Sequence, residues 1–278
     1  MPSGSEKRTI PILMYHSISQ NASRKFKPFT VSPELFAEHM AYLHRHAFTP
    51  VTVKQLAQAL AQDQSLLPER PVVLTFDDGF ADFFTDALPV LKRFNFTATL
   101  YVTTGFINGT SRWLQHEGEA LRPMLTWHQL AEIGSQGIEC GAHSHSHPQL
   151  DTLPIAEATY EIVQSKQLLE EQLGLDVTSF AYPFGYYTSA IQKQVQVAGF
   201  TSACAVKFAM SSPSSDLFAL ARLMIQSDTN VEAFAALLSK GSTSVITTMY
   251  TRARTPVWQL VRRGSALVKH HLGDATVK

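Results

Sequence analysis

Short apolar runs alternate along the chain with segments whose apolar residues recur at helical spacing. The runs are rich in Val, Ile, Leu and Phe, which is typical of buried strands. Strands are predicted over residues 10–15, 72–76, 97–102, 137–142, 179–182, 203–206 and 220–225. Because strand and helix alternate about seven times, the pattern indicates an α/β fold of parallel strands joined by helical crossovers.

Capping residues mark several of the helices between these strands. Ser32, Thr52 and Thr126 are good N-caps and predict three helix starts. A longer helix over residues 155–173 is expected to end at Gly174, since glycine readily takes the left-handed conformation that terminates helices. Two further helices are predicted over residues 189–198 and 231–239.

Polar residues stand directly after four of the predicted strands. These residues are His16, Asp77-Asp78, His143 and Pro183-Phe184-Gly185. Barrel enzymes place their catalytic groups at the carboxyl ends of the strands. We therefore predict a distorted (β/α)7 barrel with parallel strands rather than an open sheet. The barrel domain is expected over residues 1–245, followed by a basic amphipathic helical tail over residues 246–278.

Two of these polar segments have the composition of a metal site. His143 and His147 are four residues apart, a spacing found in many metal sites. Together with one carboxylate they would form a set of three ligands that leaves positions open for water and substrate. Asp77 and Asp78 offer such a carboxylate and a general base, although Asp-Asp-Gly is also a common surface turn. His145, between the two histidines, is expected to be a bystander.

The third segment, residues 180–185, ends in a Pro-Phe-Gly sequence. One interpretation is a strand followed by an ordinary turn. The other is a wall of an active site, with a backbone N–H pointing into it.

Together, the three segments resemble the polysaccharide deacetylases of the NodB-homology group, carbohydrate esterase family four. Residues 75–79 read Thr-Phe-Asp-Asp-Gly, the first motif of that family. Residues 143–147 match the second motif, His-Ser/Thr-x-x-His, and Pro148 follows as usual. Residues 181–184 match the third motif, Arg-x-Pro-Tyr/Phe, only in part, because Ala181 stands in place of the arginine.

The sequence departs from the common family pattern downstream of Gly185, where the late motifs are missing. The late histidine of the family normally serves as general acid. Here the start, with Met14-Tyr15-His16, resembles a circularly permuted subgroup that includes deacetylases of biofilm poly-N-acetylglucosamine. That resemblance assigns the acid role to His16. Arg222 is a candidate replacement for the missing arginine at position 181; the alternative is a charge that pairs with a helix or loop.

The resemblance implies a metal-dependent removal of acetyl groups from N-acetylated sugars. Asp78, His143 and His147 would hold the metal, for which Zn²⁺ fits best and Co²⁺, Ni²⁺ or Fe²⁺ could substitute. Asp77 would be the general base, the Phe184 N–H would help to bind the oxyanion, and Tyr182 and Pro183 would contact the carbohydrate. An O-acetyl carbohydrate esterase and a non-catalytic glycan-binding protein remain as alternatives.

Charge and composition narrow the partners and the location. Lys+Arg and Asp+Glu both number 23, so no net charge attracts nucleic acid. Cys140 and Cys204 are expected to be buried free thiols. With no signal peptide visible, the chain is expected to be cytoplasmic, although a chain trimmed of its export signal would look the same. The basic tail could contact a membrane surface, or could pack on the barrel.

For four further residues the sequence gives less specific predictions. Asp82 and Asp86 are expected near the start of the next helix, where acidic residues interact well with the helix dipole. Trp113 and Trp127 are expected to pack in the core, with a sugar-stacking platform as the alternative.

Overall fold

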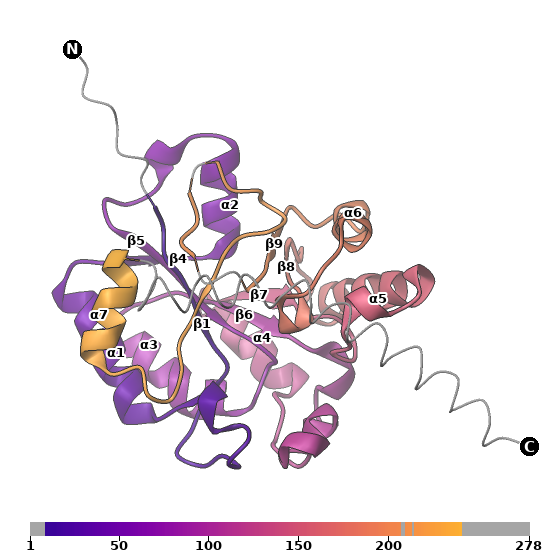
Figure 1. The fold of residues 1–278 in the computed structure, drawn as a ribbon, viewed down its shortest axis with the longest axis horizontal. Coiled ribbons are helices and arrows are strands. Elements are labelled where there is room, and N and C mark those ends of the chain that lie inside the picture. The colour runs from indigo at the N-terminus through magenta and orange to yellow at the C-terminus, as the bar shows by residue number, and fades with distance from the viewer. Residues whose placement is uncertain (1–8, 207–208, 213, 241–278) are drawn as a thin grey trace, which may run out of the picture.

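The computed structural model describes residues 9–206, 209–212 and 214–240, and a curved parallel sheet lies at its centre with helices around it (Figure 1). Seven strands follow one another in the order β10-β1-β5-β6-β7-β8-β9. Their bounds are β1 Ile12–Tyr15, β5 Pro71–Phe76, β6 Thr99–Val102, β7 Glu139–Ala142, β8 Ser179–Ala181, β9 Ser202–Cys204 and β10 Leu223–Met224. All seven predicted strands are therefore confirmed.

The sheet closes on itself through an irregular junction. Leu220, three residues before β10, forms a parallel bridge with Cys204 in β9. The Ala205 N–H donates to the Leu220 carbonyl at 2.8 Å, and the Leu220 N–H donates to the Ala203 carbonyl at 2.9 Å. The predicted strand over residues 220–225 thus divides, with its start paired to β9 and its end paired to β1. The predicted distorted barrel is confirmed, and this divided strand is one source of the distortion.

Three short strands were not predicted. β4 (Thr49–Val51) pairs with the start of β5, and β2 (Ser17–Ile18) pairs with β3 (Thr30–Val31) in a separate sheet. β4 contains Pro50, which lacks the amide hydrogen that sheet pairing uses. The other two strands have two residues each, too few for any alternation to be visible.

The predicted helices and their caps are confirmed. They are α1 (Pro33–Arg45), α2 (Val53–Ala61), α4 (Trp127–Ser135), α5 (Ile155–Leu173), α6 (Ser189–Val197) and α7 (Val231–Lys240). Ser32, Thr52 and Thr126 each accept a hydrogen bond from the backbone three residues on. α3 (Leu88–Arg93) follows a π-helical turn, Phe83–Ala87. Single 3-10 turns cover Lys27–Phe29, Gln64–Leu66, Thr104–Phe106, Arg112–Glu117, Leu150–Thr152 and Pro183–Gly185.

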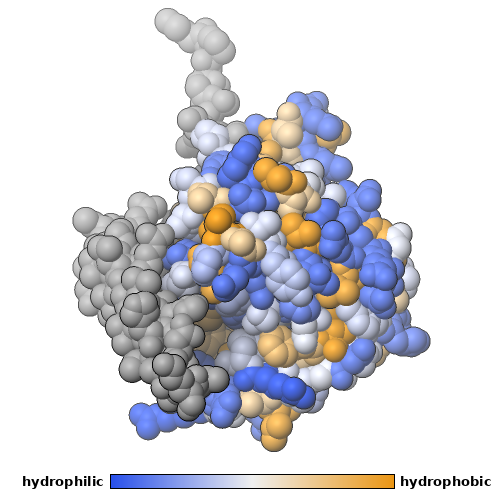
Figure 2. Space-filling model, turned by 90° about the vertical axis from the view of Figure 1, so that its right-hand side faces the viewer, coloured by the Kyte–Doolittle hydropathy of each residue, from blue (hydrophilic) through white to orange (hydrophobic). Residues whose placement is uncertain are grey.

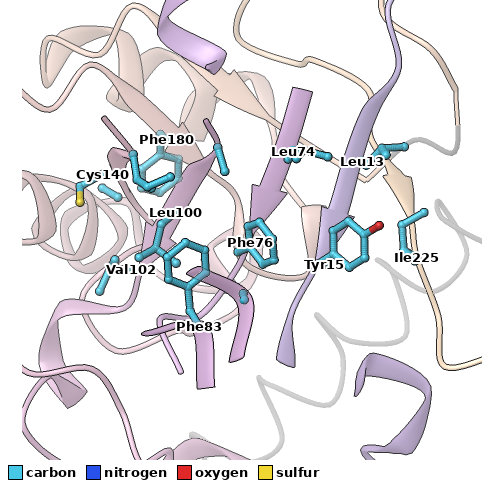
Figure 3. Close-up of a cluster of buried hydrophobic side chains, with 14 of the residues drawn as sticks. Leu13, Tyr15, Leu74, Phe76, Phe83, Leu100, Val102, Cys140, Phe180 and Ile225 are labelled. Carbon is cyan, nitrogen blue, oxygen red and sulfur yellow. The ribbon is translucent and has the colours of Figure 1, made fainter. Parts of the chain in front are cut away.

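Side chains of the strands alternate between the helical layer and the inside of the barrel. Leu74 and Phe76 of β5 belong to the large core under the helices, together with Leu13, Tyr15, Leu100 and Phe180 (Figure 3). Val73, between them in sequence, belongs to a second cluster with Ile12, Tyr101 and Cys204. Because side chains alternate along a strand, Asp77 continues the row of Val73 and points into the barrel.

The structure tests some of the remaining expectations, which concern the cysteines and the C-terminal tail. Cys140 and Cys204 are buried free thiols, as predicted. No helix of the described residues is long and apolar enough to span a bilayer. The face on the side of α5 and α6 mixes hydrophilic and hydrophobic residues (Figure 2). The predicted tail, residues 246–278, and the predicted domain boundary lie outside the described residues.

Candidate active site

The carboxyl ends of several strands meet in one pocket of about 340 Å³. β1 ends beside His16, β5 beside Asp77 and Asp78, and β7 beside His143. The full lining comprises Met14, His16, Phe26, Phe29, Asp77, Asp78, Trp113, Leu114, Glu117, His143, His147, Phe184, Gly185, Tyr186, Val206 and Met224. The barrel therefore collects residues from the whole length of the chain at one rim, as predicted.

Asp78, His143 and His147 lie in the arrangement of a metal-binding set. One potential ligand atom from each lies within 4.8 Å of the others. Asp78 Oδ1 lies 3.2 Å from His147 Nε2 and 3.5 Å from His143 Nε2. This oxygen is buried and, among the described residues, has no hydrogen-bond partner. A buried oxygen without a hydrogen bond, placed between two imidazole nitrogens, fits a divalent cation of the Zn²⁺ type.

The ring of His143 is held in an orientation that suits metal binding. Its Nδ1 lies 2.8 Å from the Ala181 carbonyl, so this nitrogen carries the proton and Nε2 is left to face Asp78. Burial, opposed by the charges of Asp77 and Asp78, lowers the pKa of His143 to about 4. The imidazole is therefore neutral at pH 7, which is the form that ligates metals.

The backbone around these ligands adopts conformations that few residues tolerate. Asp78, Ser144 and His147 have φ of 77°, 62° and 60°. Gly79 follows with φ of 86°, and a Cβ there would lie 2.9 Å from Cγ1 of Val102. The turn takes Asp78 out of the strand alternation while Asp77 stays in it, so the two adjacent carboxylates reach different neighbours. Left-handed residues of this kind cost of order 1 kcal/mol each and cluster at functional sites.

The loop that leads from His143 to His147 is held by hydrogen bonds within itself and to α5. Glu161 of α5 accepts from the Ser146 N–H at 2.7 Å and from the Ser146 hydroxyl at 2.6 Å. The Ser144 hydroxyl accepts from the His147 N–H at 3.0 Å. These contacts within the protein therefore fix the position of His147.

Asp77 is held by a buried guanidinium. Arg222 donates to Asp77 Oδ1 at 2.6 Å and to Oδ2 at 2.8 Å, in a two-pronged ion pair. Both side chains are buried. Burial alone would raise the pKa of Asp77, but the charge of Arg222 and the hydrogen bonds that it donates hold this pKa below its ordinary value. Arg222 also donates to the Thr75 hydroxyl at 3.2 Å. Asp77 is therefore ionised and fixed in orientation.

His16 faces the same pocket from the end of β1. The edge of its ring meets Phe29, with 5.2 Å between ring centroids. Its Nδ1 is buried and has no hydrogen-bond partner in the described part of the chain. Burial lowers the pKa of His16, whereas the carboxylates of Asp78 and Asp77 act to raise it. The imidazole is thus a titratable group set opposite two carboxylates.

Known proteins are similar to this chain in sequence and in fold. A sequence model described as polysaccharide deacetylase matches residues 65–203. YxkH of Bacillus subtilis (strain 168) is 30% identical over 229 residues, which cover 82% of this chain and 76% of that protein. The chain belongs to the polysaccharide deacetylase family.

Two further proteins are similar to this deacetylase, one in sequence and one in structure. The poly-β-1,6-N-acetyl-D-glucosamine N-deacetylase of Staphylococcus aureus (strain MRSA252) is 22% identical over 217 residues, covering 75% of this chain and 72% of that protein. The structure of the Streptococcus pyogenes deacetylase PplD in complex with acetate superposes with a TM-score of 0.73 at 26% identity, covering 84% and 99% of the two chains. The predicted family and barrel are confirmed.

The end of the third segment lines the pocket, as one of its two interpretations predicts, but Tyr182 and Pro183 do not. Tyr182 is fully buried in the core under the helices, where its hydroxyl donates to the Phe218 carbonyl at 3.0 Å. Pro183 is also buried, and neither residue lines the pocket. The prediction of carbohydrate contacts for this pair is not supported, because strand alternation turns Ala181 inward and Tyr182 outward. Phe184, Gly185 and Tyr186 form the wall instead.

Aromatic residues from two loops complete the pocket, and the sequence did not reveal most of them. Trp113 lies with its ring centroid 5.4 Å from that of His147, so it is a pocket residue and not only a core residue. Phe26 and Phe29 reach the pocket from the loop after β2. Such loops carry neither the strand nor the helix period, so only their aromatic content could have marked them. Trp127 packs against the core, as predicted.

His145 and Asp82, which lie in or near the two motifs, contact residues outside the metal-binding set. His145 contacts the Thr104 hydroxyl through Nδ1 at 3.0 Å and lies outside the metal-binding set, which fits the expected bystander. Asp82 stands at the start of the π-helical turn, but its side chain makes no capping hydrogen bond. It accepts from the Ser17 hydroxyl at 2.6 Å and pairs with Arg122 instead.

Proposed function

We propose that this deacetylase hydrolyses the N-acetyl groups of a glycan built from N-acetylglucosamine-type sugars, with a divalent metal held by Asp78, His143 and His147. One observation supports this most directly: an ionised carboxylate, a set of three metal ligands and a free imidazole share one pocket. The Staphylococcus aureus relative, whose name specifies poly-β-1,6-N-acetyl-D-glucosamine, supports the choice of substrate.

The ligand set suits Zn²⁺, and Co²⁺, Ni²⁺ or Fe²⁺ could occupy it. Two imidazoles and one carboxylate leave coordination positions open, which catalytic sites need. When bound, such an ion lowers the pKa of water to about 7 and polarises a carbonyl oxygen.

Asp77 is the general base of the proposed reaction. It is ionised and lies on the metal side of the pocket, with Oδ2 3.8 Å from His143 Nε2. From there it accepts the proton of the attacking water. Arg222 acts as a positioning residue, because its two-pronged contact fixes the carboxylate plane. Arg222 takes the place of the arginine that the third family motif has where this sequence has Ala181.

His16 is the general acid, and the turn at Phe184 supplies an oxyanion donor. Burial lowers the pKa of His16, and the carboxylates of Asp78 and Asp77 oppose this shift. In the proposed reaction the protonated imidazole of His16 donates its proton to the departing sugar amine. Phe184 has φ of 59°, in a turn that forms part of the pocket wall. Its N–H would stabilise the developing oxyanion, and losing one such donor typically costs about 2.7–4 kcal/mol.

An acetate-release assay tests this function. We expect release from N-acetylglucosamine oligomers, little release from acetylated xylan, and a loss of both activities in Asp77→Asn. Preferential release from xylan would favour the O-acetyl esterase instead. Tight binding of the oligomers without any acetate release would favour a glycan-binding protein.

A further inference from the structure

We propose that Arg122, which lies outside the pocket, is a positioning residue that sets the shape of the sugar-binding walls. The inference rests on the proposed function, since it assigns the walls to carbohydrate recognition. Arg122 is joined to two other stretches of chain, one with Ser17 and Asn21 and one with Asp82, and to Glu119 in its own loop. Each of these three stretches contributes residues to the pocket.

The guanidinium makes an unusually large number of polar contacts for a residue outside the catalytic centre. It donates to Asp82 Oδ2 at 3.2 Å, to the Ser17 hydroxyl at 3.0 Å and to the Asn21 carbonyl at 2.8 Å. It also pairs with Glu119 at 3.0 Å. The Arg122 side chain is only 9% exposed. A buried charge with this many partners is costly to disturb.

Each partner adjoins a part of the pocket. Ser17 directly follows His16, and Asp82 comes four residues after Asp78. Asn21 lies in the loop that continues to the aromatic wall. Arg122 itself closes the loop whose members Trp113, Leu114 and Glu117 line the opposite part of the pocket.

The same guanidinium covers a small aromatic cluster behind those walls. It lies 5.1 Å from the ring centroid of Phe26 and 5.6 Å from that of Phe80. The Phe80 ring in turn stacks on Trp113, with 6.2 Å between centroids. This cluster has three buried members, Phe26, Phe80 and Met124, and is separate from the main core. Ala22, Phe29, Phe106, Trp113 and Leu114 pack against these three residues. Ser23 and Lys25 add hydrogen bonds between the two loops, and the Arg122 guanidinium joins both loops to Asp82 as well.

The metal-binding set is held by contacts that do not use the Arg122 guanidinium. Glu161 and the Ser144 hydroxyl hold the histidine loop. The turn at Gly79 is held by backbone bonds, from the Leu125 N–H to the Gly79 carbonyl and from the Ala81 N–H to the Pro123 carbonyl. Loss of Arg122 is therefore expected to loosen sugar recognition and leave metal binding intact. This separation distinguishes a positioning role from general destabilisation.

The test compares Arg122→Met and Arg122→Lys with Arg112→Met, an exposed arginine of the same loop. Substrates are an N-acetylglucosamine pentamer and a small aryl acetate that needs no sugar wall. For Arg122→Met we expect kcat/KM on the pentamer to fall about 10- to 100-fold, mainly through KM, with metal content and aryl acetate turnover unchanged. Arg122→Lys recovers part of the loss, since it keeps the charge but has fewer donors in a fixed geometry. Arg112→Met behaves as wild type.

A readout independent of catalysis separates this inference from the proposed function. Trp113 is the single tryptophan left when Trp127 and Trp258 are replaced by Phe. In that background we expect acrylamide to quench Trp113 more strongly after either substitution of Arg122. If the wild type releases no acetate but quenching rises, the proposed function fails and the positioning role stands. Unchanged quenching in the soluble Arg122→Lys variant, or equal losses on the pentamer and the aryl acetate, would overturn the inference.

Discussion

The two ends of the barrel surround their carboxylates in opposite ways: Glu139 at the amino end is half-buried, and Asp78 at the carboxyl end is buried. At the amino end, Glu139 of β7 accepts from the Thr99 hydroxyl at 2.8 Å, the Ser179 hydroxyl at 2.5 Å and the Lys54 N–H at 2.9 Å. These neutral donors from three elements satisfy both of its oxygens. At the carboxyl end, Asp78 Oδ1 has no hydrogen bond among the described residues.

Several neighbours of Asp78 also have side-chain atoms available for a ligand. His16, His147 and Trp113 at the carboxyl end each have a buried nitrogen without a partner in the described chain. Four residues there, Asp78, Ser144, His147 and Phe184, also have left-handed backbone. Each unpaired buried group costs roughly 1–3 kcal/mol. The difference teaches that the carboxylate at the amino end is fully hydrogen-bonded within the protein, whereas the carboxylate at the carboxyl end keeps an oxygen available to bind a metal.

Removing a metal ligand tests this contrast with the largest expected effect. We expect His143→Ala to lose bound metal and to release acetate no faster than buffer alone. Metal analysis and the acetate assay, run on the same preparation, check this. His145→Ala, two residues away and outside the ligand set, is the matched control and is expected to keep both. A metal-replete, active His143→Ala protein would contradict the assignment of the ligands.

Replacing the general base is expected to have the next largest effect. Asp77→Asn keeps the shape of the side chain but cannot take a proton, so kcat should fall about 10²- to 10⁴-fold with metal content unchanged. The pair with the buried Arg222 also loses its charge, so the free energy of unfolding should fall. Kinetics and denaturant unfolding measure the two effects. Near-normal turnover would show that the base lies elsewhere.

His16→Ala tests the acid on the other side of the pocket. We expect a rate loss of about 10²-fold, with the metal retained. The bell-shaped pH profile of the wild type should lose its alkaline limb, because that limb reports deprotonation of the acid. A full pH profile of kcat/KM checks this. An unchanged alkaline limb would mean that another group donates the proton.

Glu139→Ala probes the amino end and is expected to act on stability alone. The three donors around Glu139 would lose their acceptor, which costs about 1–3 kcal/mol of unfolding free energy. Acetate release per folded molecule should match the wild type, since Glu139 lies at the opposite end of β7 from His143. Urea unfolding and the acetate assay separate the two quantities. A selective loss of activity with normal stability would remove the distinction between the ends.

The features predicted correctly from sequence were those encoded locally. The seven apolar runs, the caps Ser32, Thr52 and Thr126, and the two motifs around Asp78 and His143 each lie within a few adjacent residues. These features placed the barrel and the metal-binding set.

The features that were missed depend on contacts between distant segments. Tyr182 was assigned to the substrate although its strand turns it into the core. Arg122 carried no signal, because its contacts with Ser17 and Asp82 span 105 and 40 residues. Arg222 was named as a candidate only through the family resemblance, because its contact with Asp77 spans 145 residues and no local pattern shows it. Such pairs are set by the three-dimensional arrangement rather than by local pattern.

Acetate release from an N-acetylglucosamine pentamer, measured before and after metal removal by a chelator, tests the central claim most directly. The account predicts that the chelated protein stays folded, loses acetate release, and regains it when Zn²⁺ is restored in a one-to-one ratio. Unchanged acetate release from the chelated, metal-free protein would contradict the account.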